Sequence, residues 1–103
     1  MLSIGNVTFV SPLLLAPMAG ISDLPFRLIN RSFGCGFAFT EMISAGSLIH
    51  QNKKTLKMLT SSSYDRPLGV QILGSDQEII KRALDILSVY DVFDMIDFNS
   101  ACP

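Results

Sequence analysis

The chain has 103 residues, of which 49% are hydrophobic and 17% are charged, and its formal net charge is −1. This composition is typical of a folded globular domain or a piece of one, and it excludes a disordered or fibrous chain. The near-neutral charge lacks the basic footprint of many nucleic-acid-binding domains. Polar residues interrupt every apolar stretch before the roughly 20 residues that a membrane span needs.

The start of the chain has neither the basic residues nor the small-residue cleavage site of a signal peptide, so we expect a cytoplasmic protein without membrane association. Its two cysteines, Cys35 and Cys102, are too few for a disulfide framework and are interpreted as reduced thiols. No zinc motif is present, and His50 has no cysteine or acidic neighbour at metal spacing, so no metal site is expected.

The first predicted strand is the apolar run at residues 13–16, which is expected to be buried and to end at Pro17. A helix is predicted to follow it. Ser22 and Asp23 offer N-cap oxygens for this helix, and Gly34 favours its end.

The second strand is predicted at residues 37–40, and the second helix at residues 42–50. A basic stretch with Lys53, Lys54 and Lys57 continues or follows that helix. These lysines are interpreted as a solvated face rather than as a phosphate-binding patch.

The third strand is predicted at residues 68–73. Ser75 and Glu78 form a capping-box pattern at the start of a third helix, which runs to Leu87. Residues 95–98 predict a fourth strand.

The alternation of strands and helices indicates an α/β fold with a parallel sheet. A doubly wound sheet and a TIM (β/α)8 barrel both fit this order. Since a barrel of roughly 250 residues has about 31 residues per unit, this chain would hold its N-terminal portion, with the first four strands. No G-x-G-x-x-G follows the first strand, which favours the barrel, although periodicity alone leaves both architectures open.

In either architecture, functional residues gather at the carboxyl ends of the strands. These ends carry small or polar residues: residues 16–20, Thr40, Glu41, Gln71, Asp97, Asn99 and Cys102. Buried amides need hydrogen-bond partners, so Gln71 and Asn99 indicate a site for a flat polar ligand. The alternatives are a satisfied core amide for Gln71, a helix cap for Glu41 and an inert thiol for Cys102.

Four segments together resemble one family. Residues 15–27 read LAPMAGISDLPFR, and residues 96–103 read IDFNSACP; between them lie TEMISA at residues 40–45 and PLGVQILG at residues 67–74. The first and last are similar to the APMAG-x-[ST]-D-x-x-FR and D-x-N-x-GCP motifs of the tRNA-dihydrouridine synthases. One departure is Ala101, which stands where that family usually has glycine. A methyl group there narrows the available backbone conformations.

The resemblance implies a flavoprotein oxidoreductase of tRNA processing: a barrel that binds FMN at its mouth and reduces the uracil 5,6 double bond in tRNA with NADPH. The residues that it implies for FMN binding are Pro17, Met18, Ala19, Gln71 and Asn99, with Glu41 in a supporting role. Cys102 matches the family's catalytic cysteine and would donate a proton to C5, since a protonated thiol can serve as a general acid.

Family members continue through further barrel strands and a helical tRNA-binding domain. The resemblance therefore implies that residues 1–103 are a single incomplete domain that lacks the C-terminal half-barrel and that helical domain. Such a chain is expected to be inactive alone and to self-associate through exposed apolar surface. The alternatives are another FMN-dependent TIM-barrel oxidoreductase and a non-catalytic truncated product.

Overall fold

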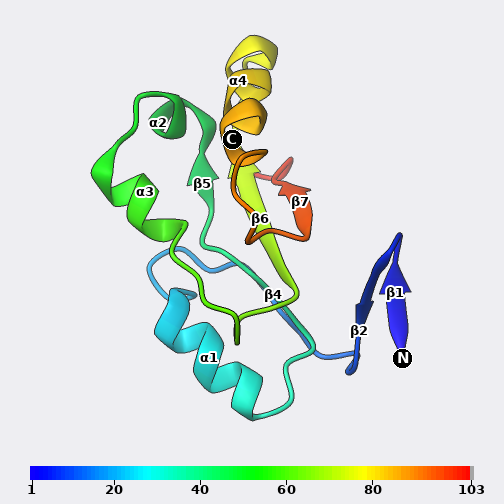
Figure 1. Ribbon diagram of the computed structural model, residues 1–103. Helices are drawn as coiled ribbons and strands as arrows, with labels where there is room; N and C mark the ends of the chain where they lie inside the picture. Colours follow the sequence, from blue (N-terminus) through cyan, green and yellow to red (C-terminus); the bar gives the residue numbers. More distant parts are fainter. Residues whose placement is uncertain (103) are drawn as a thin grey trace.

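The computed structural model describes residues 1–102. It opens with an antiparallel hairpin, β1 (Leu2–Ile4) and β2 (Val7–Phe9), which stands apart from the helices in Figure 1. The other elements are β3 (Leu14–Leu15), α1 (Leu24–Ser32), β4 (Phe37–Phe39), β5 (Ile43–Ser44), α2 (Ala45–Ile49), α3 (Lys53–Met58), β6 (Leu68–Leu73), α4 (Gln77–Leu87) and β7 (Met95–Phe98). The sequence analysis did not predict the hairpin, because its three-residue strands are too short to show an alternating pattern.

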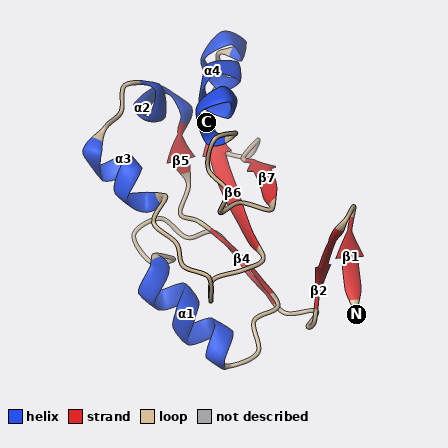
Figure 2. Ribbon diagram, viewed as in Figure 1, coloured by secondary structure: helices blue, strands red, loops and turns tan. Residues whose placement is uncertain are grey.

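The strands after the hairpin form one parallel sheet (Figure 2). β3 pairs with β4, both β4 and β5 pair with one edge of β6, and β7 pairs with the other edge. Successive strands are thus added on the same side, without the reversal of order that defines a doubly wound sheet. This arrangement confirms the predicted parallel α/β fold and is compatible with the first four strands of a TIM barrel.

A bulge separates β4 from β5. Ala38 pairs with Leu68 and Ile43 pairs with Ile72, so the chain advances five residues while β6 advances four. The extra residue lies next to Thr40, whose hydroxyl accepts a hydrogen bond from the Gln71 N–H at 3.2 Å. Such bulges re-aim the neighbouring side chains.

Helix α1 begins and ends as predicted. Asp23 caps it by accepting a hydrogen bond from the Phe26 N–H at 3.1 Å. At the other end Gly34 has a positive φ of 96°, and the Cys35 N–H donates to the Asn30 carbonyl at 3.1 Å. This is a Schellman motif, which glycine permits because it has no Cβ.

Two predicted helix starts are wrong. The second helix begins at Ala45 rather than Met42, because the bulge and β5 occupy the intervening residues and Ser44 caps the helix. A turn then separates α2 from α3. At α4 the N-cap is Asp76 rather than Ser75, since the Asp76 carboxylate accepts the Ile79 N–H at 3.0 Å.

The two faces of β6 have different surroundings. Val70 and Ile72 face the helices and belong to a buried core cluster that also contains Ile43, Ala45, Leu48, Leu59, Ala83 and Leu87. Gly69 and Gln71 face the other way. On that inner face Gly69 leaves room for Phe39, whose ring would lie 2.6 Å from a Cβ at position 69.

The first strand of the parallel sheet is less buried than predicted. Leu13 and Leu14 are 61% and 46% exposed, and Leu15 is half-buried. Within residues 1–102, β3 is hydrogen-bonded on one edge only, to β4, and Leu14 shares the open inner face with its partner Phe37. An apolar sequence therefore indicated burial that these residues alone do not supply.

Arg66 joins the loop before β6 to the loop before β7. Its guanidinium pairs with the Asp94 carboxylate, which also accepts the Leu68 N–H at 2.8 Å. Burial raises the pKa of Asp94, but hydrogen bonds from Arg66 and the Leu68 N–H and the charges of Arg66 and Arg31 outweigh it, so that the pKa is lowered overall. The hydrogen bond to Asp94 in turn raises the pKa of Arg66.

Candidate functional site

Gln71 and Asp97 lie opposite each other on the inner face of β6 and β7. Gln71 Nε2 donates to Asp97 Oδ2 at 2.6 Å. Gln71 Oε1 receives a much longer contact, 3.5 Å from Asn99 Nδ2. The amide is therefore fixed in orientation by a short hydrogen bond, while its oxygen retains acceptor capacity. The sequence analysis placed Asp97 at a strand end without giving it this role.

Asn99 organises the turn that follows β7. Its backbone N–H extends the sheet by donating to the Ile72 carbonyl at 2.9 Å. Its Oδ1 accepts the N–H groups of Ala101 and Cys102, each at 3.0 Å. This side-chain bonding to backbone two and three residues on is an Asx-type turn, and it fixes the position of Cys102 relative to the strand.

The Cys102 thiol is free and exposed, and Sγ lies 3.5 Å from Asn99 Nδ2. Ala101, the departure from the family motif, is compatible with the turn. Within residues 1–102, Gln51 is the one non-glycine residue with a positive φ, so Ala101 has a backbone conformation open to any residue. The methyl group needs no strained backbone here.

The loop after β3 is held by Ser22 and Glu41. The Ser22 hydroxyl accepts the Met18 N–H at 2.9 Å and donates to the Met18 carbonyl at 3.1 Å. Glu41 Oε1 accepts the Gly20 N–H at 2.7 Å. Pro17 and Met18 are half-buried and Ala19 is exposed. Glu41 is thus not the cap of α2 but a clamp on this loop.

A buried ion pair supports Ser22 from below. Arg27 and Asp65 are 1% and 0% exposed, and Arg27 Nε donates to Asp65 Oδ2 at 2.8 Å. Arg27 also donates to the carbonyls of Ser22 and Thr60, at 2.8 and 3.0 Å. The sequence analysis missed this pair, because Arg27 in a helix and Asp65 in a polar loop show no sign of burial before the chain folds.

The predicted site residues fall into two groups. The first group contains Gln71, Asn99 and Cys102, which contact one another. The second consists of residues 17–19, which are tied to Glu41 through the neighbouring Gly20. Within residues 1–102 no hydrogen bond joins the two groups directly, but Asn99 Nδ2 lies 3.2 Å from the sulfur of Met42, the residue after Glu41.

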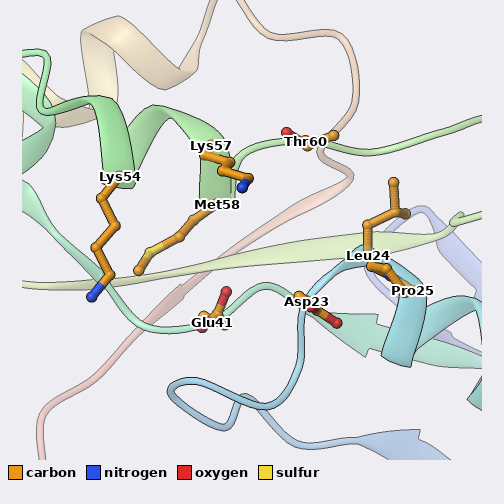
Figure 3. Close-up of a pocket in the computed structure, with 8 residues that line it drawn as sticks. All are labelled: Asp23, Leu24, Pro25, Glu41, Lys54, Lys57, Met58 and Thr60. Carbon is orange, nitrogen blue, oxygen red and sulfur yellow. The ribbon is translucent and has the colours of Figure 1, made fainter.

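A cavity of about 530 Å³ borders the first group, a volume within the usual range for small-molecule sites. Its walls include Ser44, Gly46, Gly74, Asp76, Asn99 and Cys102. A second cavity of about 580 Å³ borders Glu41, between α1 and α3 (Figure 3). Both cavities therefore adjoin the carboxyl ends of the strands, where the sequence analysis expected a site.

Two classes of feature were searched for in residues 1–102. No group of three or more His, Cys, Asp or Glu side chains is arranged to hold a metal ion. No helix in this part of the chain is long and apolar enough to cross a membrane.

Comparison with known proteins identifies relatives of the chain. The dihydrouridine synthase family model matches residues 14–103. A probable tRNA-dihydrouridine synthase from Helicobacter pylori (strain J99) is 41% identical over 91 residues, which cover 88% of this chain and 28% of that protein. The tRNA-dihydrouridine synthase B of Pseudomonas aeruginosa is 35% identical over 100 residues, 97% of this chain and 30% of that protein. The chain thus spans less than a third of the length of these curated relatives.

Proposed function

Because the chain belongs to the dihydrouridine synthase family, we propose that it forms the N-terminal half of an FMN-binding barrel that reduces uridine in tRNA. The observation that carries this proposal is the meeting of Gln71, Asn99 and Cys102 at the carboxyl ends of two neighbouring parallel strands, beside a cavity. In this proposal residues 1–103 are one incomplete domain, and the remaining barrel strands and a helical tRNA-binding domain belong to the rest of the protein.

The donor and acceptor groups at this edge fit a flavin. An isoalloxazine ring has a flat apolar body and a polar edge of donors and acceptors. Asn99 Nδ2 has only weak partners within residues 1–102, namely two sulfur atoms and one oxygen at 3.5 Å, and Gln71 Oε1 has spare acceptor capacity. The half-buried Pro17 and Met18 supply apolar surface.

In the proposed site, Gln71 and Asn99 bind the polar edge of FMN, and Pro17, Met18 and Ala19 lie against its ring. Bound FMN, reduced by NADPH, would supply the hydride that C6 of the uracil receives. Asp97 keeps the Gln71 amide oriented through the 2.6 Å hydrogen bond. Glu41 supports the site indirectly, because it holds the loop that carries Ala19.

Cys102 has the position and chemistry of the general acid. Its exposed thiol would donate a proton to C5 of a uracil that has left its base stack, and the resulting thiolate would regain a proton from solvent. The two hydrogen bonds from the turn to Asn99 Oδ1 restrict where that proton can be delivered. Hydride at C6 and proton at C5 together saturate the 5,6 double bond.

The test compares Cys102→Ala with Cys35→Ala, the other free thiol, in the protein at its natural full length. NADPH-driven flavin reduction is followed by absorbance, and dihydrouridine formed in tRNA is measured separately. Loss of a general acid should slow uridine reduction about 10²- to 10⁴-fold, with flavin reduction retained. Cys35 should be dispensable, because its thiol donates only to the neighbouring Phe37 carbonyl. Equal rates for wild type and Cys102→Ala would remove Cys102 from the mechanism.

The proposal extends to the setting of the reaction. We propose a cytoplasmic, tRNA-modifying oxidoreductase whose first 103 residues are inactive alone. Ile96 and Phe98 of β7 are 45% and 47% exposed, and within residues 1–102 β7 has a paired strand on one edge only. Such an edge is prone to self-association unless further structure covers it.

A further inference from the structure

The second cavity, next to the proposed flavin site, contains the chemistry of a nucleotide-binding subsite. Figure 3 shows Lys54, Lys57 and Met58 extending from α3 into the cavity, with Leu24 and Pro25 on its other side and Glu41 below. Its volume of about 580 Å³ is in the range of small-molecule sites. The lysines, which the sequence analysis interpreted as a solvated face, therefore line a concave surface.

The two ammonium groups have no anionic partner in the described chain. The ion pairs within residues 1–102 use Arg27, Arg31 and Arg66, so neither Lys54 nor Lys57 is neutralised by a carboxylate. Because the two lysines are three residues apart, they lie on the same side of α3. Two flexible cations on one wall of a cavity suit a phosphate group.

The other walls suit a ribose and a base. Leu24, Pro25 and Met58 form an apolar surface that a base or the face of a sugar can contact. Glu41 is oriented by its 2.7 Å hydrogen bond from Gly20, which uses Oε1. Its remaining oxygen can accept a hydrogen bond from a ribose 2′-hydroxyl, the group that distinguishes RNA from DNA.

The cavity is joined to the proposed active site through Glu41. This residue holds Gly20, which ends the loop of residues 17–19, and its chain neighbour Met42 contacts Asn99. A group bound in the cavity is therefore next to the proposed flavin site and outside it.

We propose that this cavity binds a nucleotide of the tRNA substrate adjacent to the target uridine, with its phosphate on Lys54 and Lys57 and its ribose on Glu41. The inference rests on the proposed function, because it assumes that tRNA is the substrate.

The test uses the protein at its natural full length and measures tRNA binding between 50 and 200 mM salt. Lys54→Ala/Lys57→Ala is compared with Lys81→Ala/Arg82→Ala, which removes the same charge from exposed positions on α4. Each lost contact to a single-stranded phosphate lowers the slope of log affinity against log salt by about 0.7, so the first variant should lose about 1.4. Lys54→Arg/Lys57→Arg, which keeps both charges, should retain most of the slope.

Equal slopes for the two alanine variants would overturn the subsite. Dihydrouridine formation by the wild-type protein is measured in parallel. If the wild type binds tRNA with the expected loss of slope but forms no dihydrouridine, the subsite stands and the proposed reaction fails. If the wild type binds no tRNA, both proposals fail.

Discussion

The buried ion pair between Arg27 and Asp65 gives a sharp prediction, because one carboxylate faces two guanidinium groups. Asp65 is 0% exposed and accepts hydrogen bonds from Arg27 Nε at 2.8 Å, Arg31 Nη2 at 3.3 Å and Ser61 Oγ at 3.2 Å. Asp65→Asn keeps the shape of the side chain and removes its charge. Arg27 then remains buried at 1% exposure without an anion.

Removing one partner of a buried pair costs about 3–5 kcal/mol, because the remaining charge loses both water and its counterion. We expect the upper part of this range, since a second guanidinium, Arg31, loses the same anion. Such a loss is a large share of the roughly 5–15 kcal/mol that typical domains possess. The free energy of unfolding is measured by urea titration of the protein at its natural full length.

Arg66→Ala is the matched control. Arg66 pairs with Asp94 near the surface, where its side chain is 42% exposed. Exposed pairs contribute about 0.2–1 kcal/mol. If Asp65→Asn and Arg66→Ala destabilise the protein equally, the buried network does not hold α1 against the loop that carries Asp65. We also expect Asp65→Asn to weaken FMN binding, because Arg27 supports the Ser22 carbonyl and thereby the Met18 loop.

Three further predictions follow from other parts of the fold. Although burial raises the pKa of Asp94, its hydrogen bonds and nearby arginine charges lower it overall; wild type should therefore exceed Asp94→Asn in unfolding free energy above about pH 4, and the difference should shrink as pH falls through the lowered pKa. A difference that grows on acidification would refute this sign. Gly69→Ala should destabilise by about 1–3 kcal/mol in urea titration, since its Cβ would meet Phe39 at 2.6 Å; a neutral effect would show that the ring moves freely. The 103-residue chain alone should associate through exposed Ile96 and Phe98, whereas a monodisperse monomer in sedimentation with a cooperative melt would contradict that expectation.

Local sequence determined much of the fold. The third and fourth predicted strands match β6 and β7 residue for residue, because each is a short apolar run bounded by polar residues. Helix α1 was also predictable, since Asp23 and Gly34 mark its ends by their own backbone chemistry. The strand-end motifs indicated the family, and the family match over residues 14–103 confirms it.

Tertiary structure decided what the local pattern left open. The bulge near Thr40 depends on pairing with β6, which begins 28 residues later, so no short window of sequence could show it. The same bulge delays α2 and turns Glu41 from an expected cap into a clamp on Gly20. The partners of Gln71 and the burial of Arg27 likewise come from residues 26 and 38 positions away. A side chain's own chemistry fixes which hydrogen bonds and ion pairs it can form, but its actual partner and its burial depend on which distant segments the folded chain brings together.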